Sequence, residues 1–373
     1  MHLKPLGLLA ILLATVLVPA NYTQAQSAEA IDLIASLGLR ESAIASRDLT
    51  NWQRPKKIVV LTDSQKRIDW LAKVAPGVEL VAAANSRAIL REIADAQVFI
   101  GFCFPPAIHA GSELTWVQAM SAGVGRCTAD GALKDRGVLL TNAQRLYGPA
   151  MSEHTIALLL ALNRRFDHFI RRGAESRRDR VLEHGDAGTW ELPGRTMLVV
   201  GLGGIGTEVA RRANALGMRV IATRNSSRKG PEFVEYVGLA DELMELVPQA
   251  DAIVNVTPLT PATTGLFDAA FFKAMKPSAY FINIGRGRSV VTDDLVAAIK
   301  NGELAGAGLD VTDPEPLPAD HELWALPRVI ITPHVSARSD KSGQRRWILV
   351  KENLRRYIAG EPMLSVVDLE RGY

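Results

Sequence analysis

Residues 196–206 read TMLVVGLGGIG, an apolar segment that runs directly into four glycines. Its apolar first half predicts a buried strand, and residues 205–216 predict an amphipathic helix. A strand, a G-x-G-x-x-G run and a helix in this order form the dinucleotide-binding fingerprint. In that motif Gly201 permits a tight turn, Gly203 lets the backbone approach a pyrophosphate, and Gly206 lets the helix pack on the strand. The stretch therefore predicts an open parallel α/β sheet that binds a dinucleotide.

Strand-like apolar runs recur on both sides of this stretch and alternate with segments of helical periodicity. We expect strands at residues 58–61, 78–82, 98–101, 115–118, 138–141, 219–223, 252–256, 279–284, 306–311 and 329–332. One long helix is predicted from residue 149 to about residue 172, and a last helix from about residue 341 to residue 358. Alternating strands and helices favour parallel sheets, so the chain is expected to be an α/β protein.

The length of 373 residues favours two domains over one large core. We expect two Rossmann-like, doubly wound parallel sheets, with a cofactor domain inserted into a flavodoxin-like substrate domain. The substrate domain would cover residues 56–150 and be completed by residues 338–373, where the last helix returns to it. Residues 151–337 would form the NAD(P)-binding Rossmann domain, and residues 26–55 an N-terminal extension with one helix near residues 31–37.

The first 25 residues follow the pattern of a secretory signal peptide. Lys4 precedes an uncharged, mostly apolar run from Leu6 to Ala20, and a polar stretch continues to Ala25. The run is shorter than the roughly 20 residues that a membrane-spanning helix needs, so we expect no permanent membrane span. The sequence therefore predicts cleavage after Ala25 and a periplasmic or secreted protein. A cytoplasmic protein is the alternative if the segment is not cleaved.

The chain has two cysteines, Cys103 and Cys127. In an oxidising compartment they could pair, although their separation in sequence does not give their distance in the fold. A free cysteine behaves as a small apolar residue that proteins usually bury. Two buried free thiols are therefore the expectation.

The charge pattern indicates a small-molecule partner rather than a nucleic acid. The formal net charge is only +3, which is low for a protein that must neutralise many phosphates. The arginines concentrated in residues 164–180 alternate with acids at helical spacing, which favours a solvated helix face. We also expect no metal ion in the site.

The end of the strand at residues 219–223 indicates which dinucleotide binds. In NAD-binding folds an acid at this point accepts hydrogen bonds from the ribose hydroxyls. Arg224, Ser226 and Arg228 stand here instead, in a turn without a carboxylate. Guanidinium and hydroxyl groups suit a 2′-phosphate, so NADP(H) is favoured, with NAD(H) as the alternative. The other interpretation is a surface turn whose arginines contact only water.

The C-terminal half contains the three residue types that reduction of a 2-keto acid requires. Arg286 follows the strand at residues 279–284, at the edge where open α/β sheets bind ligands, and could bind a carboxylate. His334 follows the strand at residues 329–332 and could donate a proton. Glu315 could keep that ring charged, because a neighbouring carboxylate stabilises imidazolium near neutral pH. Each residue alone would be an ordinary side chain, but together they indicate one catalytic site.

These motifs, in this order, resemble those of the D-isomer-specific 2-hydroxyacid dehydrogenases, in particular the glyoxylate/hydroxypyruvate reductase-like members. The resemblance covers residues 58–360 and rests, besides the glycine fingerprint, on the stretches 257–263, 275–277, 283–287, 310–316 and 332–334. It implies hydride transfer between NAD(P)H and a small 2-keto or D-2-hydroxy acid. It also implies that Arg286 binds the substrate carboxylate, and that Glu315 hydrogen-bonds to His334. His334 would be the general acid in reduction and the base in oxidation.

The resemblance, together with the turn after residue 223, defines a set of expected binding residues. Those expected at the cofactor are Gly201, Gly203, Gly204, Ile205, Gly206, Arg224, Ser226, Arg228, Thr257, Pro258, Leu259, Thr263, Ile284, Gly285, Asp310 and His334. Asp310 would approach the nicotinamide amide. The backbone amides of Ala122 and Gly123 would bind the substrate carboxylate together with Arg286. The family usually forms two-fold dimers through the cofactor domain, so a homodimer is expected.

The sequence leaves the walls of the substrate pocket less defined. The family usually has an acid just after the 121–124 loop, and Gly125 stands there instead. Residues 102–106 and Leu146 are expected to set the size of the pocket. His154 has no partner pattern like that of His334, and we expect it on a polar face of the long helix.

Two other functions fit parts of the pattern. Relatives of this fold serve as non-catalytic, dinucleotide-sensing interaction proteins, but the presence of Arg286, Glu315 and His334 together favours an enzyme. A formate or phosphite oxidiser is the second alternative. Formate chemistry in this fold usually needs an asparagine in the substrate loop, and none is evident in residues 121–125.

Overall fold

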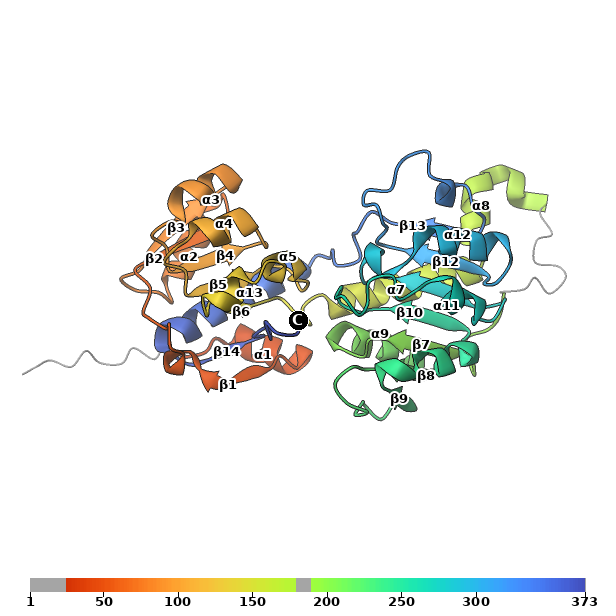
Figure 1. Cartoon of the computed structure of the whole chain (residues 1–373), viewed down its shortest axis with the longest axis horizontal. Helices are drawn as coiled ribbons and strands as arrows, with labels where there is room; N and C mark the ends of the chain where they lie inside the picture. The colour runs from red at the N-terminus through yellow and green to blue at the C-terminus, as the bar shows by residue number, and fades with distance from the viewer. Residues whose placement is uncertain (1–24, 179–188, 373) are drawn as a thin grey trace, which may run out of the picture.

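The computed structural model describes residues 25–178 and 189–372, which fold around two parallel sheets that lie side by side (Figure 1). The predicted α/β class is confirmed. In this part of the chain no helix is both long and apolar enough to cross a membrane. The apolar run at residues 6–20, on which the signal peptide was predicted, lies outside the described residues.

The smaller sheet has five parallel strands in the spatial order β3-β2-β4-β5-β6. Its strands are β2 (Lys57–Leu61), β3 (Glu79–Ala83), β4 (Val98–Gly101), β5 (Trp116–Ala119) and β6 (Leu139–Thr141). This is the flavodoxin-like order, in which the first strand of the unit lies between the second and third. All five strands lie where the apolar runs predict them.

Helices cover both faces of this sheet. They are α2 (Gln65–Ala72), α3 (Ser86–Glu92), α4 (Pro105–Ala110), α5 (Gly125–Thr128), α6 (Ala132–Asp135) and α13 (Ser342–Ala359). Ile58 and Val60 of β2 pack with α2 and α13, whereas Val59 between them packs with α3 to α6. Successive strand residues point to opposite faces, so an uninterrupted apolar strand fills two cores. The last helix returns to this sheet as expected (Figure 1).

The larger sheet has seven parallel strands in the order β13-β12-β11-β10-β7-β8-β9. Its strands are β7 (Thr196–Val200), β8 (Arg219–Thr223), β9 (Tyr236–Gly238), β10 (Ala252–Asn255), β11 (Tyr280–Asn283), β12 (Gly306–Leu309) and β13 (Val329–Ile331). The order reverses beside β7, which is the topological switch point where dinucleotides bind in Rossmann folds. In this sheet only β9 has no counterpart among the predicted strands, because its sequence, Tyr-Val-Gly, is not an uninterrupted apolar run like those of the other strands.

Two cores lie on opposite faces of the larger sheet. Met197 and Val199 face the core shared with α7 (Gly148–Asn163) and α9 (Gly204–Ala215). Leu198 and Val200 face the core shared with α10 (Leu243–Leu246), α11 (Ala269–Lys273) and α12 (Thr292–Lys300). The sheet is thus doubly wound, and α9 begins at the carboxyl end of β7.

The prediction of a single long helix from residue 149 to about residue 172 is wrong. The chain forms α7 and then α8 (Phe166–Arg172), separated at Arg165, whose φ of 58° is left-handed. A right-handed helix cannot continue through that conformation. Arg165 is buried and its Nε lies 3.6 Å from Oδ1 of Asp167, so the arginines of this region do not all lie on a solvated face.

The N-terminal extension is more structured than the single predicted helix. It forms α1 (Ala28–Leu37) and β1 (Glu41–Ala45), and β1 pairs antiparallel with β14 (Pro362–Leu364) near the end of the chain. Arg356 of α13 donates to Glu41 Oε1 at 2.7 Å. The extension is therefore attached to the five-stranded unit through β14 and α13. These segments lie more than 300 positions away in the sequence, so sequence patterns do not predict the contact.

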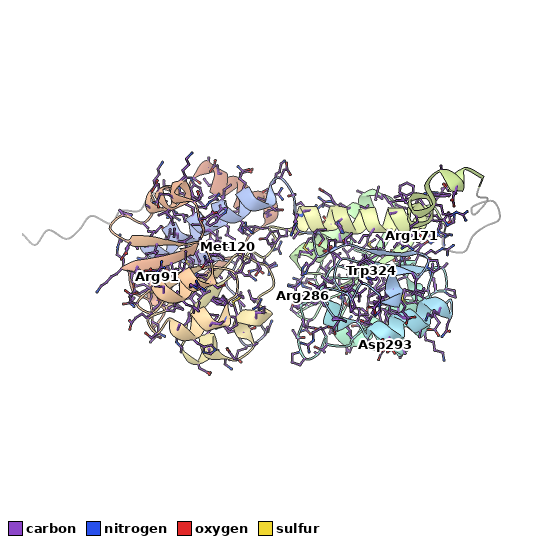
Figure 2. The ribbon with its side chains drawn as sticks, turned by 90° about the horizontal axis from the view of Figure 1, so that it is seen from above. Arg91, Met120, Arg171, Arg286, Asp293 and Trp324 are labelled. Carbon is purple, nitrogen blue, oxygen red and sulfur yellow. A yellow bond between two sulfur atoms is a disulfide. The ribbon has the colours of Figure 1, made fainter. Side chains whose placement is uncertain are left out.

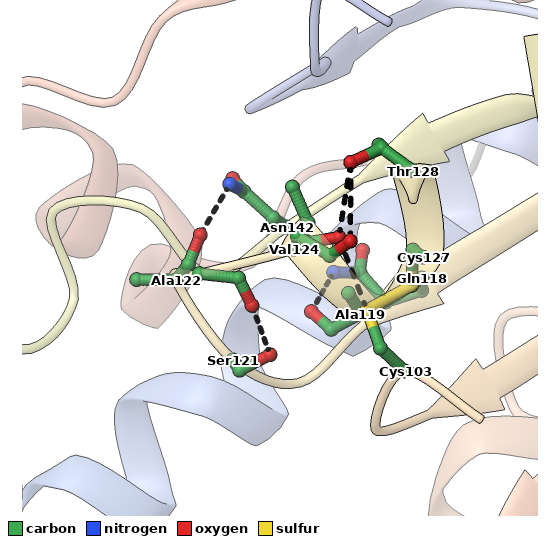
Figure 3. Close-up of a disulfide and its surroundings, with 11 residues drawn as sticks. Cys103, Gln118, Ala119, Ser121, Ala122, Val124, Cys127, Thr128 and Asn142 are labelled. Carbon is green, nitrogen blue, oxygen red and sulfur yellow. Dashed lines mark hydrogen bonds between the residues drawn. A yellow bond between two sulfur atoms is a disulfide. The ribbon is translucent and has the colours of Figure 1, made fainter. Parts of the chain in front are cut away.

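The two buried free thiols that we expected are instead a disulfide (Figure 3). Cys103 follows β4, and Cys127 lies in α5, which follows β5; their Cα atoms are 5.0 Å apart. β4 and β5 are parallel neighbours, so their carboxyl ends lie at the same edge of the sheet. Residues 24 positions apart in sequence are therefore adjacent in space.

Candidate active site

A cavity of about 710 Å³ lies between the two units, at the carboxyl ends of their strands. Arg286 lies on the side of the seven-stranded unit that faces the other unit (Figure 2). The expected residues that line the cavity are Ala122, Gly123, Gly203, Gly204, Ile205, Gly206, Thr257, Pro258, Ile284, Gly285, Arg286 and His334. Residues predicted from separate motifs thus meet around one space large enough for a ligand.

The glycine turn after β7 has the geometry that the fingerprint requires. Gly201 has a φ of 101°, which a residue with a side chain rarely adopts. A methyl group at Gly206 would overlap the carbonyl oxygen of Gly201, so α9 packs directly on the turn. A methyl group at Gly203, by contrast, would meet no atom within 4 Å. The open space at Gly203 and the N-terminus of α9 beside it fit a dinucleotide pyrophosphate.

Four of the residues predicted to bind the cofactor lie in the turn after β10, at positions 257–263. Thr257 and Pro258 line the cavity, whereas Leu259 and Thr263 do not. The Thr263 hydroxyl donates to the Pro258 carbonyl at 2.6 Å and accepts from the Thr260 amide at 2.8 Å. Thr263 therefore supports the segment that reaches the cavity.

His334 and Glu315, predicted to pair, are in direct contact. Nδ1 of His334 and Oε1 of Glu315 are 2.7 Å apart, and the two side chains are 47% and 43% exposed. With Nδ1 bonded to a carboxylate, Nε2 is the ring nitrogen that can exchange a proton with a ligand. The pair can therefore hold a proton at the wall of the cavity.

The loop that presents His334 has an unusual backbone held by Asp310. His334 has a left-handed φ of 52°, a conformation that is costly for a residue with a side chain. Its amide donates to the Asp310 carbonyl at 2.9 Å. The amides of Val335 and Ser336 donate to the Asp310 carboxylate at 2.9 and 3.0 Å. Asp310 is 1% exposed and does not line the cavity, so it fixes the His334 loop.

His154 belongs to the same network, contrary to our expectation of a merely polar helix face. The Thr332 hydroxyl donates to Oδ1 of Asp310 at 2.6 Å, so its oxygen must accept from Nε2 of His154, 2.9 Å away. His154 comes from α7 and Thr332 from the segment after β13. Sequence patterns miss this contact because the two residues are 178 positions apart.

Arg286 is held between the two units. Its Nη1 donates to the Gly285 carbonyl at 2.6 Å. A methyl group at Gly123, on the opposite unit, would overlap the guanidinium. Burial lowers the pKa of Arg286, and the nearby Glu315 carboxylate raises it. Arg286, Glu315 and His334 therefore form one electrostatic cluster.

The loop after β5, drawn in Figure 3, lines the cavity opposite Arg286. The Ser121 hydroxyl donates to the Gly123 carbonyl and Asn142 Nδ2 donates to the Ala122 carbonyl, both at 2.8 Å. In the described part of the chain, the amides of Ala122 and Gly123 have no acceptor of their own. Gly125, where the usual acid is missing, begins α5, and a methyl group there would meet no atom within 4 Å.

The turn after β8 differs from its sequence-based description. The turn itself has no carboxylate, but the fold brings Glu242 to it, and Arg228 donates to both carboxylate oxygens at 2.8 and 2.6 Å. Hydrogen bonds from Arg228 and Tyr236 lower the pKa of Glu242 to about 2. Arg224 donates to the Lys229 carbonyl at 2.8 Å and has no carboxylate partner in the described residues. Arg224, Ser226 and Arg228 lie outside the cavity lining.

Several cavity residues were not predicted from sequence. They are Ser121, Asn142, Gln144, Arg145, Tyr147, Met151, Val256, Ser336, Ala337, Arg338, Ser339, Ser342, Gly343 and Arg346. Phe102 lines the cavity as expected, whereas Leu146 is fully buried in the core. The side chain of Arg145 lies against the glycine turn. It is so close that a methyl group at Gly204 would overlap it. Nothing in the sequence separates Arg145 and Arg346 from ordinary surface cations.

Comparisons with known proteins agree with this fold. The family described as D-isomer specific 2-hydroxyacid dehydrogenase, NAD binding domain, matches residues 156–336. The glyoxylate reductase/hydroxypyruvate reductase of Homo sapiens is 33% identical over 268 residues, which are 70% of this chain and 79% of the relative.

Solved structures give the same result. A D-isomer specific 2-hydroxyacid dehydrogenase family protein from Aeromonas salmonicida has a TM-score of 0.71 and 31% identity, and the match covers 84% of this chain and 99% of that one. An NADPH-dependent glyoxylate/hydroxypyruvate reductase from Sinorhizobium meliloti, in complex with NADP and sulfate, has a TM-score of 0.71 and 28% identity, covering 85% and 100%.

The glycine turn at the switch point and the cluster of Arg286, Glu315 and His334 describe a dinucleotide-dependent dehydrogenase. The chain belongs to the D-isomer specific 2-hydroxyacid dehydrogenase family. It is an oxidoreductase with an NAD(P)-binding domain.

Proposed function

We propose that this enzyme reduces small 2-keto acids to D-2-hydroxy acids, and catalyses the reverse oxidation, with Arg286, Glu315 and His334 as its catalytic residues. The contact between His334 and Glu315 beside Arg286, on the wall of one cavity, is the observation that carries the proposal. Each of the three chemical requirements is met by a different side chain.

The substrate carboxylate binds between the two units. Arg286 provides a cation, and the free amides of Ala122 and Gly123 provide two further donors from the opposite side. A planar guanidinium binds a carboxylate through two parallel hydrogen bonds, which fixes the orientation of the adjacent keto group. The contact between Gly123 of one unit and Arg286 of the other thus places both groups where they can orient the substrate carboxylate.

The proton is handled by His334. The glycine turn and the segment at Thr257 and Pro258 would hold the nicotinamide cofactor, which when bound would supply the hydride for the keto carbon. Nε2 of His334 donates a proton to the keto oxygen, and Glu315 stabilises the charged ring before transfer. In the reverse direction the same nitrogen accepts the hydroxyl proton. A dinucleotide sensor that catalyses no reaction would not need a proton donor such as His334 or the carboxylate of Glu315 beside it.

A spectrophotometric screen tests the proposal. Glyoxylate, hydroxypyruvate and pyruvate are assayed with NADPH and with NADH, and oxidation of the cofactor is followed by its absorbance. Turnover with at least one keto acid is expected. Cofactor binding without turnover of any keto acid would favour the sensor instead.

NADP(H) is the proposed cofactor, with NAD(H) as the alternative. Among the described residues Arg224 has no carboxylate partner, whereas Arg228 is paired with Glu242. Burial lowers the pKa of Arg145, and the nearby charges of Arg40 and Arg224 lower it further. Three guanidiniums near the glycine turn suit a ligand with more than one phosphate group. The NADP bound in the Sinorhizobium meliloti structure supports the same choice.

Export remains a proposal that rests on the first 25 residues. The disulfide between Cys103 and Cys127 supports it, since disulfides persist mainly in oxidising compartments. Mass spectrometry of the native protein should give an N-terminus near Gln26. An intact N-terminus in the cytosol would contradict export. The expected homodimer likewise stays a prediction, and sedimentation measurements would test it.

A further inference from the structure

The cavity carries more positive charge than the proposed reaction uses. Four arginines line it, namely Arg145, Arg286, Arg338 and Arg346, and no Asp or Glu is among the described residues of its wall. Arg286 would bind the carboxylate next to the keto group. Arg145 lies against the glycine turn and is placed for the cofactor phosphates. Arg338 and Arg346 have no part in either task.

Arg346 lies in the wall of the cavity beside an aromatic ring. It comes from α13, and its guanidinium lies 5.6 Å from the centre of the Phe102 ring. Tyr147 lines the same cavity, and its hydroxyl donates to the Met120 carbonyl at 2.6 Å. Burial raises the pKa of Tyr147, and the nearby charge of Arg346 lowers it. Side chains from three distant parts of the sequence therefore meet in this part of the cavity wall. We call Phe102, Tyr147 and Arg346 the distal corner.

The charge at the distal corner is not neutralised by the described protein. Among the described residues no ion pair is formed by Arg346, and its buried Nε has no hydrogen-bond acceptor there. Another cation, Arg67, lies close enough to interact with it: burial lowers the pKa of Arg67, and the charge of Arg346 lowers it further. A partly buried cation with a like-charged neighbour attracts an anion more strongly than an exposed one does.

We propose that Arg346 binds a second anionic group of the substrate, so that the preferred substrates are 2-keto dicarboxylic acids. The inference rests on the proposed reductase function and specifies its substrate class. One planar guanidinium matches one carboxylate in a two-point contact. The chemistry at the keto carbon is unchanged, since the hydride and the proton come from the same groups. Arg346 acts on specificity, and it is not required for proton transfer.

Matched substrates test this preference. The wild-type enzyme is assayed with oxaloacetate against 2-oxobutanoate and with 2-oxoglutarate against 2-oxopentanoate, pairs that differ mainly in the distal carboxylate. We expect kcat/KM to be about 10- to 100-fold higher for the dicarboxylic member of at least one pair, mainly through KM. Equal or lower values for both dicarboxylic acids would overturn the inference.

Variants then assign the effect to a residue. Arg346→Gln should remove the preference by raising KM for the dicarboxylic acids, with little change in kcat for the monocarboxylic acids. Arg346→Lys should restore part of it, because the charge remains without the planar fork. Arg345→Gln, on the same helix but outside the cavity wall, is the matched control and should keep the preference. Arg338→Gln tests the exposed cation at the cavity; loss of the preference there instead would reassign the site.

The outcomes separate the inference from the function on which it rests. Turnover of monocarboxylic acids without a dicarboxylic preference leaves the reductase intact and refutes the role of Arg346. Absence of turnover with every keto acid refutes the proposed function itself. A thermal shift of the enzyme with succinate, reduced in Arg346→Gln and retained in Arg345→Gln, would support the distal anion site independently of turnover.

Discussion

The two walls of the cavity are built in different ways. On the seven-stranded side, the glycine turn and the His334 loop are set by the backbone, through the left-handed Gly201 and the hydrogen bonds to Asp310. On the five-stranded side, the distal corner consists of side chains from three separate segments, and the disulfide joins the segment after β4 to α5. The comparison teaches that the residues proposed for the chemistry lie in motifs that can be recognised in the sequence, whereas the position of the residue proposed for selection depends on tertiary contacts.

The largest expected effect is on the wall that carries the chemistry. His334→Ala should lower kcat by at least about 10²-fold and leave cofactor affinity nearly unchanged, because it removes the proton donor alone. Steady-state kinetics and titration of cofactor binding measure the two quantities. Arg286→Ala is the matched comparison and should impair both KM and kcat, since it positions the substrate. An active His334→Ala enzyme would sink the proposed mechanism.

The disulfide should matter for the stability of the opposite wall. Replacing both Cys103 and Cys127 by Ala should lower the free energy of unfolding by about 3 kcal/mol, because the unfolded chain is no longer cross-linked. Chemical denaturation with and without a reductant measures this. The reductant should destabilise the wild-type protein and leave the double variant unaffected. Equal sensitivity of both proteins would argue against a disulfide in the native enzyme.

The contact between the walls can be altered at one glycine. Gly123→Ala places a methyl group where the Arg286 guanidinium lies, so kcat/KM should fall by about 10- to 10²-fold through misplacement of that side chain. Gly125→Ala in the same region is the control, because a methyl group there meets no atom within 4 Å. Similar activities of the two variants would mean that the walls do not close on each other as described.

The smallest predicted effect concerns the cofactor turn. Arg224→Asp should reverse a preference for NADPH of about tenfold, because it replaces an attraction to the 2′-phosphate with a repulsion. Arg228→Gln should change the preference less, since Arg228 is already paired with Glu242. The ratio of kcat/KM for the two cofactors measures both. A wild-type enzyme with a lower KM for NADH would show that Arg224 faces solvent.

The positions of the strands and of the cofactor turn were readable from sequence because they depend on nearest neighbours. A fully buried parallel strand needs an uninterrupted apolar run, and the tight turn after β7 needs glycine at position 201. The pairing of Glu315 with His334 could be predicted because the resemblance to a family supplies it. The break at Arg165 was missed, since a left-handed residue inside an apolar-periodic segment leaves no mark on the periodicity.

The sequence by itself determined the two parallel sheets, the dinucleotide turn and the set of Arg286, Glu315 and His334. Only the tertiary structure decided that Cys103 meets Cys127, that Glu242 neutralises Arg228 and that Arg346 reaches the cavity. The physical reason is the range of the interactions involved. Backbone geometry and strand burial act between residues close in sequence, whereas a disulfide, an ion pair or a cavity wall joins residues that only the packing of whole elements brings together.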